Sequence, residues 1–421
     1  MRNTTRSATW SLVLLFVLLV APRGWAHGGR GIDLTRLVVV GDSLSAGFQN
    51  GSLHADHQPN SYASLVARQA GVSLSLPLIA PPGIPNVLIL VDPGPPPVVG
   101  QAPGVSSGRV DPSIQPMNLA VPGHTVRDAL EARPDLDLAT DPLGDLVLGF
   151  PGLFAGVSRS QVEWTDALAP TTVLAWLGNN DALGAALGGD ITTLTPIADF
   201  RAAYREVMRR LTATGAAIVV ANVPDVTVIP YFTPVEAAAA LVGVPLEVLG
   251  PALDVGPGDF LLPAAFELIG PILVGAIQGP LPGSVVLDAG EVDTIRAATG
   301  AYNRIIAREA WRAGAALVDV HGLLECVRVR GVVVGGQRLT TKYLGGLFSL
   351  DGIHPTNTGY AVIANEFIRV LNERFAVRIP PLSLRAVAGE DPLVLPGVGE
   401  PAYDHRSSCV GRRAFDRDDD D

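Results

Sequence analysis

Val38-Val39-Val40-Gly41-Asp42-Ser43-Leu44-Ser45 is the stretch from which the fold of this chain is inferred. The apolar run that ends at Val40 predicts a strand buried on both faces, as in a parallel sheet. A glycine and an aspartate then end this run directly before Ser43. Open α/β sheets bind ligands beyond the carboxyl ends of their strands, so a reactive side chain is expected at this serine. Serine is also a favoured helix N-cap, and the local sequence leaves both roles open.

The first 26 residues have the pattern of a secretory signal peptide. Arg2 and Arg6 precede an apolar core from Trp10 to Ala21, and small residues surround position 26. This segment is too short and wrongly flanked for a stable membrane span. We therefore predict cleavage after Ala26 and a secreted or periplasmic mature chain without a transmembrane span.

The composition indicates a globular protein. Apolar residues make up 48% and charged residues 17% of the 421 residues, so the chain can bury a substantial core. The net charge of −11 argues against a nucleic-acid partner, which would favour a basic face. No CxxC, HExxH or Walker A pattern occurs, so the sequence predicts no metal and no cofactor.

Predicted strands and helices alternate along the chain. Apolar runs at 172–177, 217–221 and 315–320 predict strands. Apolar residues at three- and four-residue spacing predict helices at 60–70, from 195 to 214, from 291 to 313, and after 356. Such alternation predicts an α/β fold with a parallel sheet covered by helices on both faces.

Three segments depart from this alternation, and we place a single domain at 27–375 around two of them. Residues 71–111 are rich in proline and glycine and predict an extended surface insertion. Residues 235–283 predict a second insertion of short apolar helices. These helices could roof the site and offer an acyl-chain pocket, or they could simply complete the core, and whether they form a lid stays open.

The third segment, 376–421, is predicted to be a poorly ordered tail with an acidic end. The chain has two cysteines, Cys326 and Cys409. In an exported protein they could pair and tie the tail to the main domain, but pairing requires a geometry that the sequence does not reveal.

Hydrolysis at a serine needs a base, a group that orients the base, and donors for the oxyanion. Asp351 lies three residues before His354, in the loop that leads into the last predicted helix. A carboxylate this close can fix the tautomer of the imidazole. Two turns that follow apolar strands supply donors, namely the backbone N–H of Gly123 and the side-chain amide of Asn180.

These motifs together resemble those of the GDSL, or SGNH, hydrolase family. Gly41-Asp42-Ser43-Leu44, the stretch 118–123, Gly178-Asn179-Asn180-Asp181 and the pair Asp351 and His354 resemble its four blocks, in the family's order. The resemblance covers about residues 37–371. It implies that Ser43 is the nucleophile, that Asp351 and His354 complete the triad, and that Ser43, Gly123 and Asn180 form the oxyanion hole. It also implies a three-layer α/β/α flavodoxin-like fold with a five-stranded parallel sheet.

The expected function is that of a serine hydrolase that cleaves carboxylic esters, a lipase or esterase, through an acyl-enzyme on Ser43. Its substrate would be a small-molecule or lipid ester, reached in the second case by transient contact with a lipid interface. One alternative is an O-acetylesterase that acts on extracellular glycans. Another is a non-catalytic surface binding module on a hydrolase scaffold. The natural ester, its acyl length and the oligomeric state are not predicted.

Overall fold

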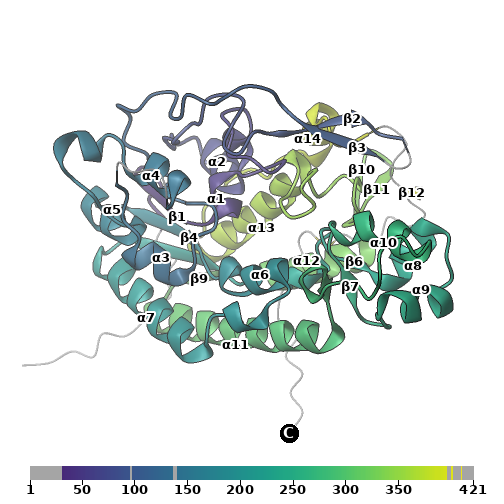
Figure 1. Cartoon of the computed structure of the whole chain (residues 1–421). Helices are drawn as coiled ribbons and strands as arrows, with labels where there is room; N and C mark the ends of the chain where they lie inside the picture. Colours follow the sequence, from purple (N-terminus) through teal and green to yellow (C-terminus); the bar gives the residue numbers. More distant parts are fainter. Residues whose placement is uncertain (1–30, 95–96, 136–139, 396–399, 402–408, 410–421) are drawn as a thin grey trace, which may run out of the picture.

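The computed structural model of the chain describes residues 31–94, 97–135, 140–395, 400–401 and 409. The predicted signal peptide and the acidic end of the tail lie outside these residues. At the centre is a parallel sheet of four strands, β1 (Leu37–Gly41), β4 (Thr172–Trp176), β5 (Ala217–Ala221) and β9 (Ala316–Val318). The strands follow one another in the order β1-β4-β5-β9. Figure 1 shows this sheet between two layers of helices. The predicted α/β fold with a parallel sheet is therefore confirmed.

The predicted fifth strand is reduced to one bridge at the edge of β1. Val39 donates its N–H to the Met117 carbonyl, and Val121 donates to the Gly41 carbonyl, so this segment follows β1 closely. Only Val39 and Asn118 form a parallel bridge. The Gly41 N–H, which would donate next along this ladder, donates instead to Oε1 of Gln161, so the pairing ends after one bridge. The strand count of five is wrong in this respect, although the segment lies where a fifth strand would.

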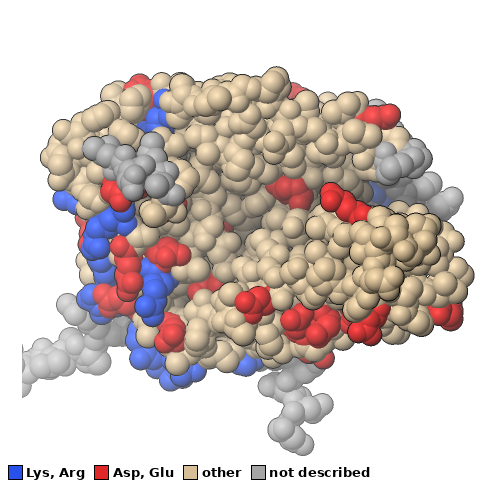
Figure 2. Space-filling view, viewed as in Figure 1, with Lys and Arg blue, Asp and Glu red and all other residues tan. Residues whose placement is uncertain are grey.

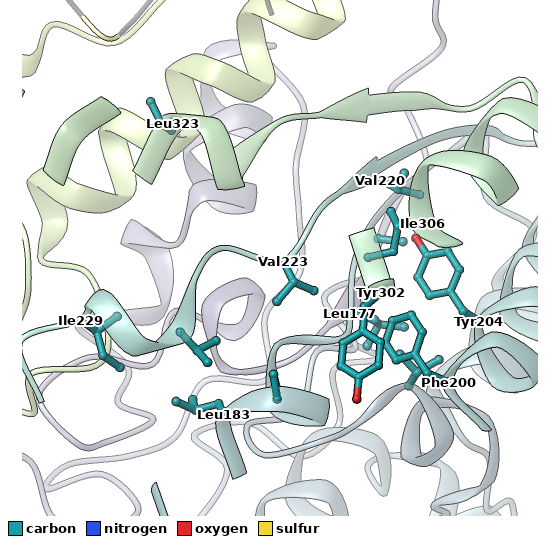
Figure 3. Close-up of a cluster of buried hydrophobic side chains, with 14 of the residues drawn as sticks. Leu177, Leu183, Phe200, Tyr204, Val220, Val223, Ile229, Tyr302, Ile306 and Leu323 are labelled. Carbon is teal, nitrogen blue, oxygen red and sulfur yellow. The ribbon is translucent and has the colours of Figure 1, made fainter. Parts of the chain in front are cut away.

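Each strand sends alternate side chains to opposite faces of the sheet, which builds two cores. Val39, Leu174 and Val219 pack with α2 (Tyr62–Gln69) and α13 (Asn357–Phe375). The strand side chains on the other face pack with α7 (Ile197–Ala213) and α11 (Ala289–Ala313), where Phe200 stacks on Tyr302 with ring centroids 4.1 Å apart. Figure 3 shows these two rings beside Tyr204, at one end of the second core.

Local signals explain the long helices. A capping box joins Asp288 and Glu291 at the start of α11, and Gly314 ends the helix in the left-handed conformation with φ 66°. Thr356 caps α13 by accepting the Gly359 N–H. The remaining helices of the main body and the carboxyl-terminal strands are α1 (Ser43–Ala46), α3 (Val126–Glu131), α4 (Pro142–Leu148), α5 (Gln161–Leu168), α6 (Asn179–Gly188), α12 (Val320–Arg330), β10 (Val332–Val334), β11 (Gln337–Leu339) and β12 (Glu400–Pro401).

Both insertions form structure of their own. Within 71–111, β2 (Leu88–Asp92) and β3 (Val98–Gln101) form an antiparallel hairpin. The second insertion contains α8 (Val235–Val242), α9 (Leu246–Leu253) and α10 (Ala265–Leu273), which pack around a separate apolar cluster, and it is joined to the body through β6 (Thr233–Pro234), β7 (Phe260–Leu261) and β8 (Val286–Leu287). Within the described ranges no single helix qualifies as a membrane span by length and hydropathy, and only α8 with α9, bent by 110°, qualifies as a pair.

The beginning of the predicted tail packs against the body. Helix α14 (Leu384–Glu390) contacts α13, and Asp391 accepts hydrogen bonds from the backbone N–H and the hydroxyl of Thr358. The expectation of poor order is wrong for this part, because these polar contacts are buried. Further along, Cys409 forms a disulfide with Cys326 of α12, with a Cα–Cα distance of 5.7 Å. The two cysteines therefore tie the tail to the main domain.

Candidate active site

Ser43 is the first residue of α1, directly beyond the end of β1. The helix is capped by Asp42, whose side chain accepts the Leu44 N–H at 3.1 Å, so the capping role considered for Ser43 is filled by its neighbour. The turn needs glycine at position 41, because a Cβ there would come within 2.2 Å of Oγ of Ser45. Ser43 lies beyond the carboxyl end of β1 and is 7% exposed.

Asp351 and His354, which the sequence predicts as the orienting carboxylate and the base, lie within hydrogen-bonding distance of each other. Nδ1 of His354 lies 3.0 Å from Oδ2 of Asp351. The other carboxylate oxygen of Asp351 accepts the backbone N–H groups of Ile353 and His354, both at 2.8 Å. The loop therefore folds back on its own carboxylate, and the imidazole is oriented by the residue three positions before it.

A second loop, which follows α1, holds the Asp351 loop in place. The Gly51 N–H donates to Oδ2 of Asp351 at 2.7 Å, so this oxygen serves both the glycine and the histidine. Asn50 adds two further bonds between the loops: its N–H donates to Oγ of Ser349, and its Oδ1 accepts the Leu350 N–H. Sequence reasoning missed these contacts, because they join residues about 300 positions apart and no local pattern marks them.

The three predicted oxyanion donors lie on three loops at one end of the sheet. Among the described residues, no acceptor is bound to the backbone N–H of Ser43 or of Gly123. Gly123 has φ +87°, in the region that favours glycine. Asn180, at the start of α6, uses its Nδ2 to donate to the His124 carbonyl at 2.9 Å. One of its two N–H bonds is thus occupied, and the second is left for a ligand.

Asn179 is a further polar residue of the site that sequence reasoning did not single out. Its Nδ2 donates to Oδ2 of Asp42 at 2.8 Å, which ties the third motif to the first. Burial raises the pKa of Asp42 to about 6, against the lowering effect of the hydrogen bonds from Asn179 and Leu44. The carbonyl oxygen of the Asn179 amide is buried without a partner. The position lies inside the motif Gly178-Asn179-Asn180-Asp181, but the motif does not reveal which asparagine faces which group.

Ser43, Asn180 and His354 line one pocket that is partly open to solvent. The rest of its wall is almost entirely apolar, and it comes from α6, α12, α13, the 3-10 turn at Val226–Val228 and the loop before α13. The apolar side chains include Leu183, Val226, Ile229, Val320, Leu323, Leu324, Val327, Leu347, Phe348, Ile353, Val362 and Ile363. Figure 3 shows Leu183, Ile229 and Leu323 at the end of the core away from the stacked aromatic rings.

The second insertion does not supply this pocket. All lining residues lie outside 235–283. The insertion's buried side chains, such as Leu249 and Leu261, pack with one another instead. The interpretation of 235–283 as the acyl-chain pocket is therefore wrong, because its apolar helix faces are used to build a core of their own. Among the residues that the structure describes, no group of three histidine, cysteine, aspartate or glutamate side chains could hold a metal ion.

Several solved structures match this chain at low sequence identity and with TM-scores below 0.4. The chain resembles LAE5, an alpha/beta hydrolase enzyme from the metagenome of Lake Arreo, Spain, at 16% identity and TM-score 0.36, over 82% of this chain and 97% of that one. It resembles the acetylxylan esterase Axe2 from Geobacillus stearothermophilus at 14% identity and TM-score 0.37, over 82% of this chain and 95% of that one. It also resembles the psychrotrophic esterase EstA from Pseudoalteromonas sp. at 11% identity and TM-score 0.35, over 82% of this chain and 100% of that one. At these TM-scores the matches support no conclusion about this chain. No match was found among curated proteins.

The family model for GDSL-like lipases and acylhydrolases matches residues 37–367. The match runs from β1 into α13 and includes every loop that carries a predicted site residue. It covers well over half of the sequence, and it agrees with the α/β fold and with the order of the four motifs. The chain therefore belongs to the GDSL-like lipase/acylhydrolase family and is an ester hydrolase.

Proposed function

We propose that this ester hydrolase cleaves neutral carboxylic esters with an acyl chain of several carbons, through an acyl-enzyme on Ser43. The observation that carries the proposal is the apolar pocket that begins at Ser43 and His354. Burial of each CH₂ group contributes about 0.8 kcal/mol, so a chain that fills this pocket binds more tightly than an acetyl group. No lysine or arginine lines the pocket, which disfavours a charged acyl group.

In the proposed first half of the reaction, His354 removes the hydroxyl proton of Ser43 while Oγ attacks the ester carbonyl. Asp351 holds the imidazole through Nδ1, so that Nε2 is the basic nitrogen. When the tetrahedral intermediate collapses, the bond to the alcohol breaks and His354 returns the proton to the leaving oxygen. The acyl group is then bound to Oγ as an ester.

In the second half, a water molecule replaces the alcohol. His354 takes one proton from the water, the hydroxide oxygen attacks the acyl carbonyl, and the carboxylic acid leaves as Ser43 regains its proton. The carbonyl oxygen carries negative charge in both intermediates. The N–H groups of Ser43 and Gly123 and the Asn180 amide are the proposed donors to it, and such donors act most strongly when they are fixed before the reaction.

The test is a series of p-nitrophenyl esters from acetate to dodecanoate, measured with wild type, Ser43→Ala and Ser45→Ala. Wild type should show kcat/KM that rises with chain length to a medium chain and then levels off. Ser43→Ala should lose nearly all activity. Ser45→Ala is the matched control, because Ser45 lies two residues further along the same helix and outside the pocket, bonded to the Tyr62 hydroxyl.

The alternatives correspond to other outcomes of the same series. Activity confined to the acetate ester would favour the O-acetylesterase and would contradict the proposed acyl chain. Full ester hydrolysis by Ser43→Ala would remove Ser43 from the reaction. Absence of hydrolysis with every ester and with acetylated glycans would favour the non-catalytic binding module.

We also propose that the chain acts outside the cytoplasm, after cleavage behind Ala26. The disulfide between Cys326 and Cys409 supports this location, because disulfides persist in oxidising compartments. Mass spectrometry of the exported protein should find a mature chain that begins at His27. Retention of an uncleaved, active protein inside the cell would contradict the proposal.

A transient contact with a lipid surface is proposed for the second insertion. Leu241, Val248 and Val274 are 74%, 57% and 80% exposed there, and no lysine or arginine occurs from 211 to 295. In Figure 2 the surface over α8–α10 shows acidic but no basic residues, whereas basic residues gather on the side of α5 and α7. Such a surface suits a zwitterionic lipid.

We expect wild type to float weakly with phosphatidylcholine vesicles, and we expect the double variant Leu241→Ser with Val274→Ser not to float. Equal flotation of wild type and the double variant would contradict the proposed lipid contact.

A further inference from the structure

A buried histidine next to Gly123 connects two of the proposed oxyanion donors. His124 directly follows Gly123 in the chain and is 5% exposed. Its carbonyl oxygen accepts the hydrogen bond from Nδ2 of Asn180. The main chain of His124 is therefore bonded covalently to one donor and by a hydrogen bond to the other, so any shift of this residue displaces both.

The His124 side chain is held between two partners. Nε2 of Gln161 lies 3.1 Å from Nδ1 of His124, and Oε1 of Gln161 accepts the Gly41 N–H at 3.0 Å. Because the Gly41 N–H can only donate, Gln161 must present its oxygen to Gly41 and its NH₂ group to the imidazole. Nδ1 of His124 then accepts, and the proton of the neutral ring lies on Nε2. This N–H donates to Oδ2 of Asp141 at 2.7 Å.

Gly123 itself has few means of fixing its own position. A Cβ placed on it would meet nothing within 4 Å, so no neighbouring group packs against its α-carbon from that side. Its φ of +87° is accessible to glycine in many turn conformations, and its N–H has no partner among the described residues. The geometry of this donor must therefore be set by its neighbours in the chain, of which His124 is the one with an anchored polar side chain.

We infer that His124 and Gln161 are positioning residues for the oxyanion hole, and that the hydrogen-bonded series Gly41, Gln161, His124, Asn180 aligns the donors from three loops. The inference rests on the proposed function, in which these donors stabilise the oxyanion. Neither His124 nor Gln161 lines the pocket, so they act through Gly123 and Asn180 rather than on the substrate.

The variants remove the contacts of Gln161 and of the His124 ring in different combinations. Gln161→Met keeps the length of the side chain but neither accepts from Gly41 nor donates to His124. His124→Asn keeps an acceptor near the position of Nδ1 and loses the bond to Asp141, and His124→Ala loses both bonds. His54→Asn is the matched control, because His54 is also buried, at 7% exposure, but its Nδ1 accepts the Asp56 N–H away from the donor loops.

The experiment measures kcat and KM of each variant on the best ester of the series, together with thermal unfolding. Gln161→Met and His124→Ala should lower kcat by roughly 10- to 100-fold with KM nearly unchanged, a fraction of the loss expected from deleting a donor. His124→Asn should recover part of this loss, and His54→Asn should retain the kcat of wild type. A role in stability alone would change the unfolding temperature and leave kcat of the folded enzyme unchanged.

A double-mutant cycle separates this inference from the proposed function. Asn180→Ala should lower kcat by roughly 100- to 1000-fold, and adding Gln161→Met to it should cost less than Gln161→Met costs alone, because the two act on one donor set. If Asn180→Ala keeps the kcat of wild type, the proposed oxyanion hole is wrong. If Asn180→Ala loses activity while Gln161→Met and His124→Ala keep it, or if the losses multiply in full, the positioning role is wrong.

Discussion

At Asp351 a buried carboxylate keeps its charge. Burial acts to raise the pKa of Asp351, but the charge of His354 and the hydrogen bonds from His354 and Ile353 outweigh it and lower the pKa to about 2. The group is therefore ionised throughout the neutral range. An ionised acceptor keeps the proton of His354 on Nδ1, which leaves Nε2 available for the base role that we propose for it.

Asp351→Asn should lower kcat by roughly 10³- to 10⁴-fold, because an amide can present its NH₂ group to Nδ1 and favour the wrong tautomer of His354. The loss should appear in kcat on p-nitrophenyl esters, while circular dichroism stays that of wild type. Asp56→Asn is the control, since the Asp56 side chain is 83% exposed. Retention of more than a tenth of the activity by Asp351→Asn would contradict the assigned role.

The pKa of Asp42 is raised, whereas that of Asp351 is lowered, and the raised pKa makes the stability of the fold depend on pH. Its pKa of about 6 in the folded chain lies above the value of about 3.8 expected when it is unfolded. The folded state thus holds this proton more tightly. The contribution of Asp42 to the free energy of unfolding is therefore fully present below the unfolded pKa and is lost as the pH rises through 6. A difference of about two pKa units corresponds to about 3 kcal/mol.

Asp42→Asn removes this titration. The new amide can still accept the Leu44 N–H, and its NH₂ group can donate to the carbonyl oxygen of Asn179, which has no partner now. We expect urea unfolding to show that the free energy of unfolding of the variant, relative to that of wild type, is higher at pH 7 than at pH 4 by about 2 kcal/mol. A difference between the two proteins that does not change with pH would contradict the raised pKa.

At the scale of elements, α12 is the wall on which acyl length should depend. It contributes Val320, Leu323, Leu324 and Val327 to the pocket. The helix carries these apolar residues at the spacing of one face, and its other face is solvated, as shown by Val329 with 57% exposure.

Leu323→Phe should shorten the accepted acyl chain, because the larger ring fills space that the chain would occupy. In the ester series we expect the optimum to move to a shorter chain, with kcat/KM on acetate changed by less than about threefold. Val329→Phe is the control on the exposed face of the same helix. An optimum at the same chain length in Leu323→Phe and wild type would show that the acyl group binds elsewhere.

Several elements could be predicted from the sequence, because their signals are local. The strand at 217–221 was predicted with the bounds that it has, and α7 and α11 begin and end within two residues of expectation. Each has an apolar pattern with the period of its structure and breakers at its ends. The hairpin of β2 and β3 was missed, since proline and glycine dominate that insertion and its strands pair only with each other.

At the scale of the whole molecule, the disulfide joins Cys409 of the carboxyl-terminal tail to the pocket wall. Cys326 lies on α12 between Leu324 and Val327, which both line the pocket, and its partner is 83 residues further along. A crosslink across a loop of this length removes conformations from the unfolded chain, and typically contributes about 2–4 kcal/mol.

Cys326→Ala with Cys409→Ala should therefore lower the free energy of unfolding by about 2–4 kcal/mol. Dithiothreitol should lower the unfolding temperature of wild type and have no further effect on the double variant. Equal stability of the oxidised, reduced and substituted proteins would show that the crosslink constrains nothing.

The sequence by itself determined the family, the parallel α/β plan and the residue types of the candidate site, because four short motifs occur in a recognisable order among apolar strands and helices. Only the tertiary structure decided how these motifs are joined: Gly51 to Asp351, Gln161 to Gly41 and His124 to Asn180. It also decided that the pocket is lined by α12 rather than by the second insertion. The physical reason is that chemistry and periodicity are written in neighbouring residues, whereas hydrogen bonds and apolar contacts between distant loops depend on how the sheet brings their ends together.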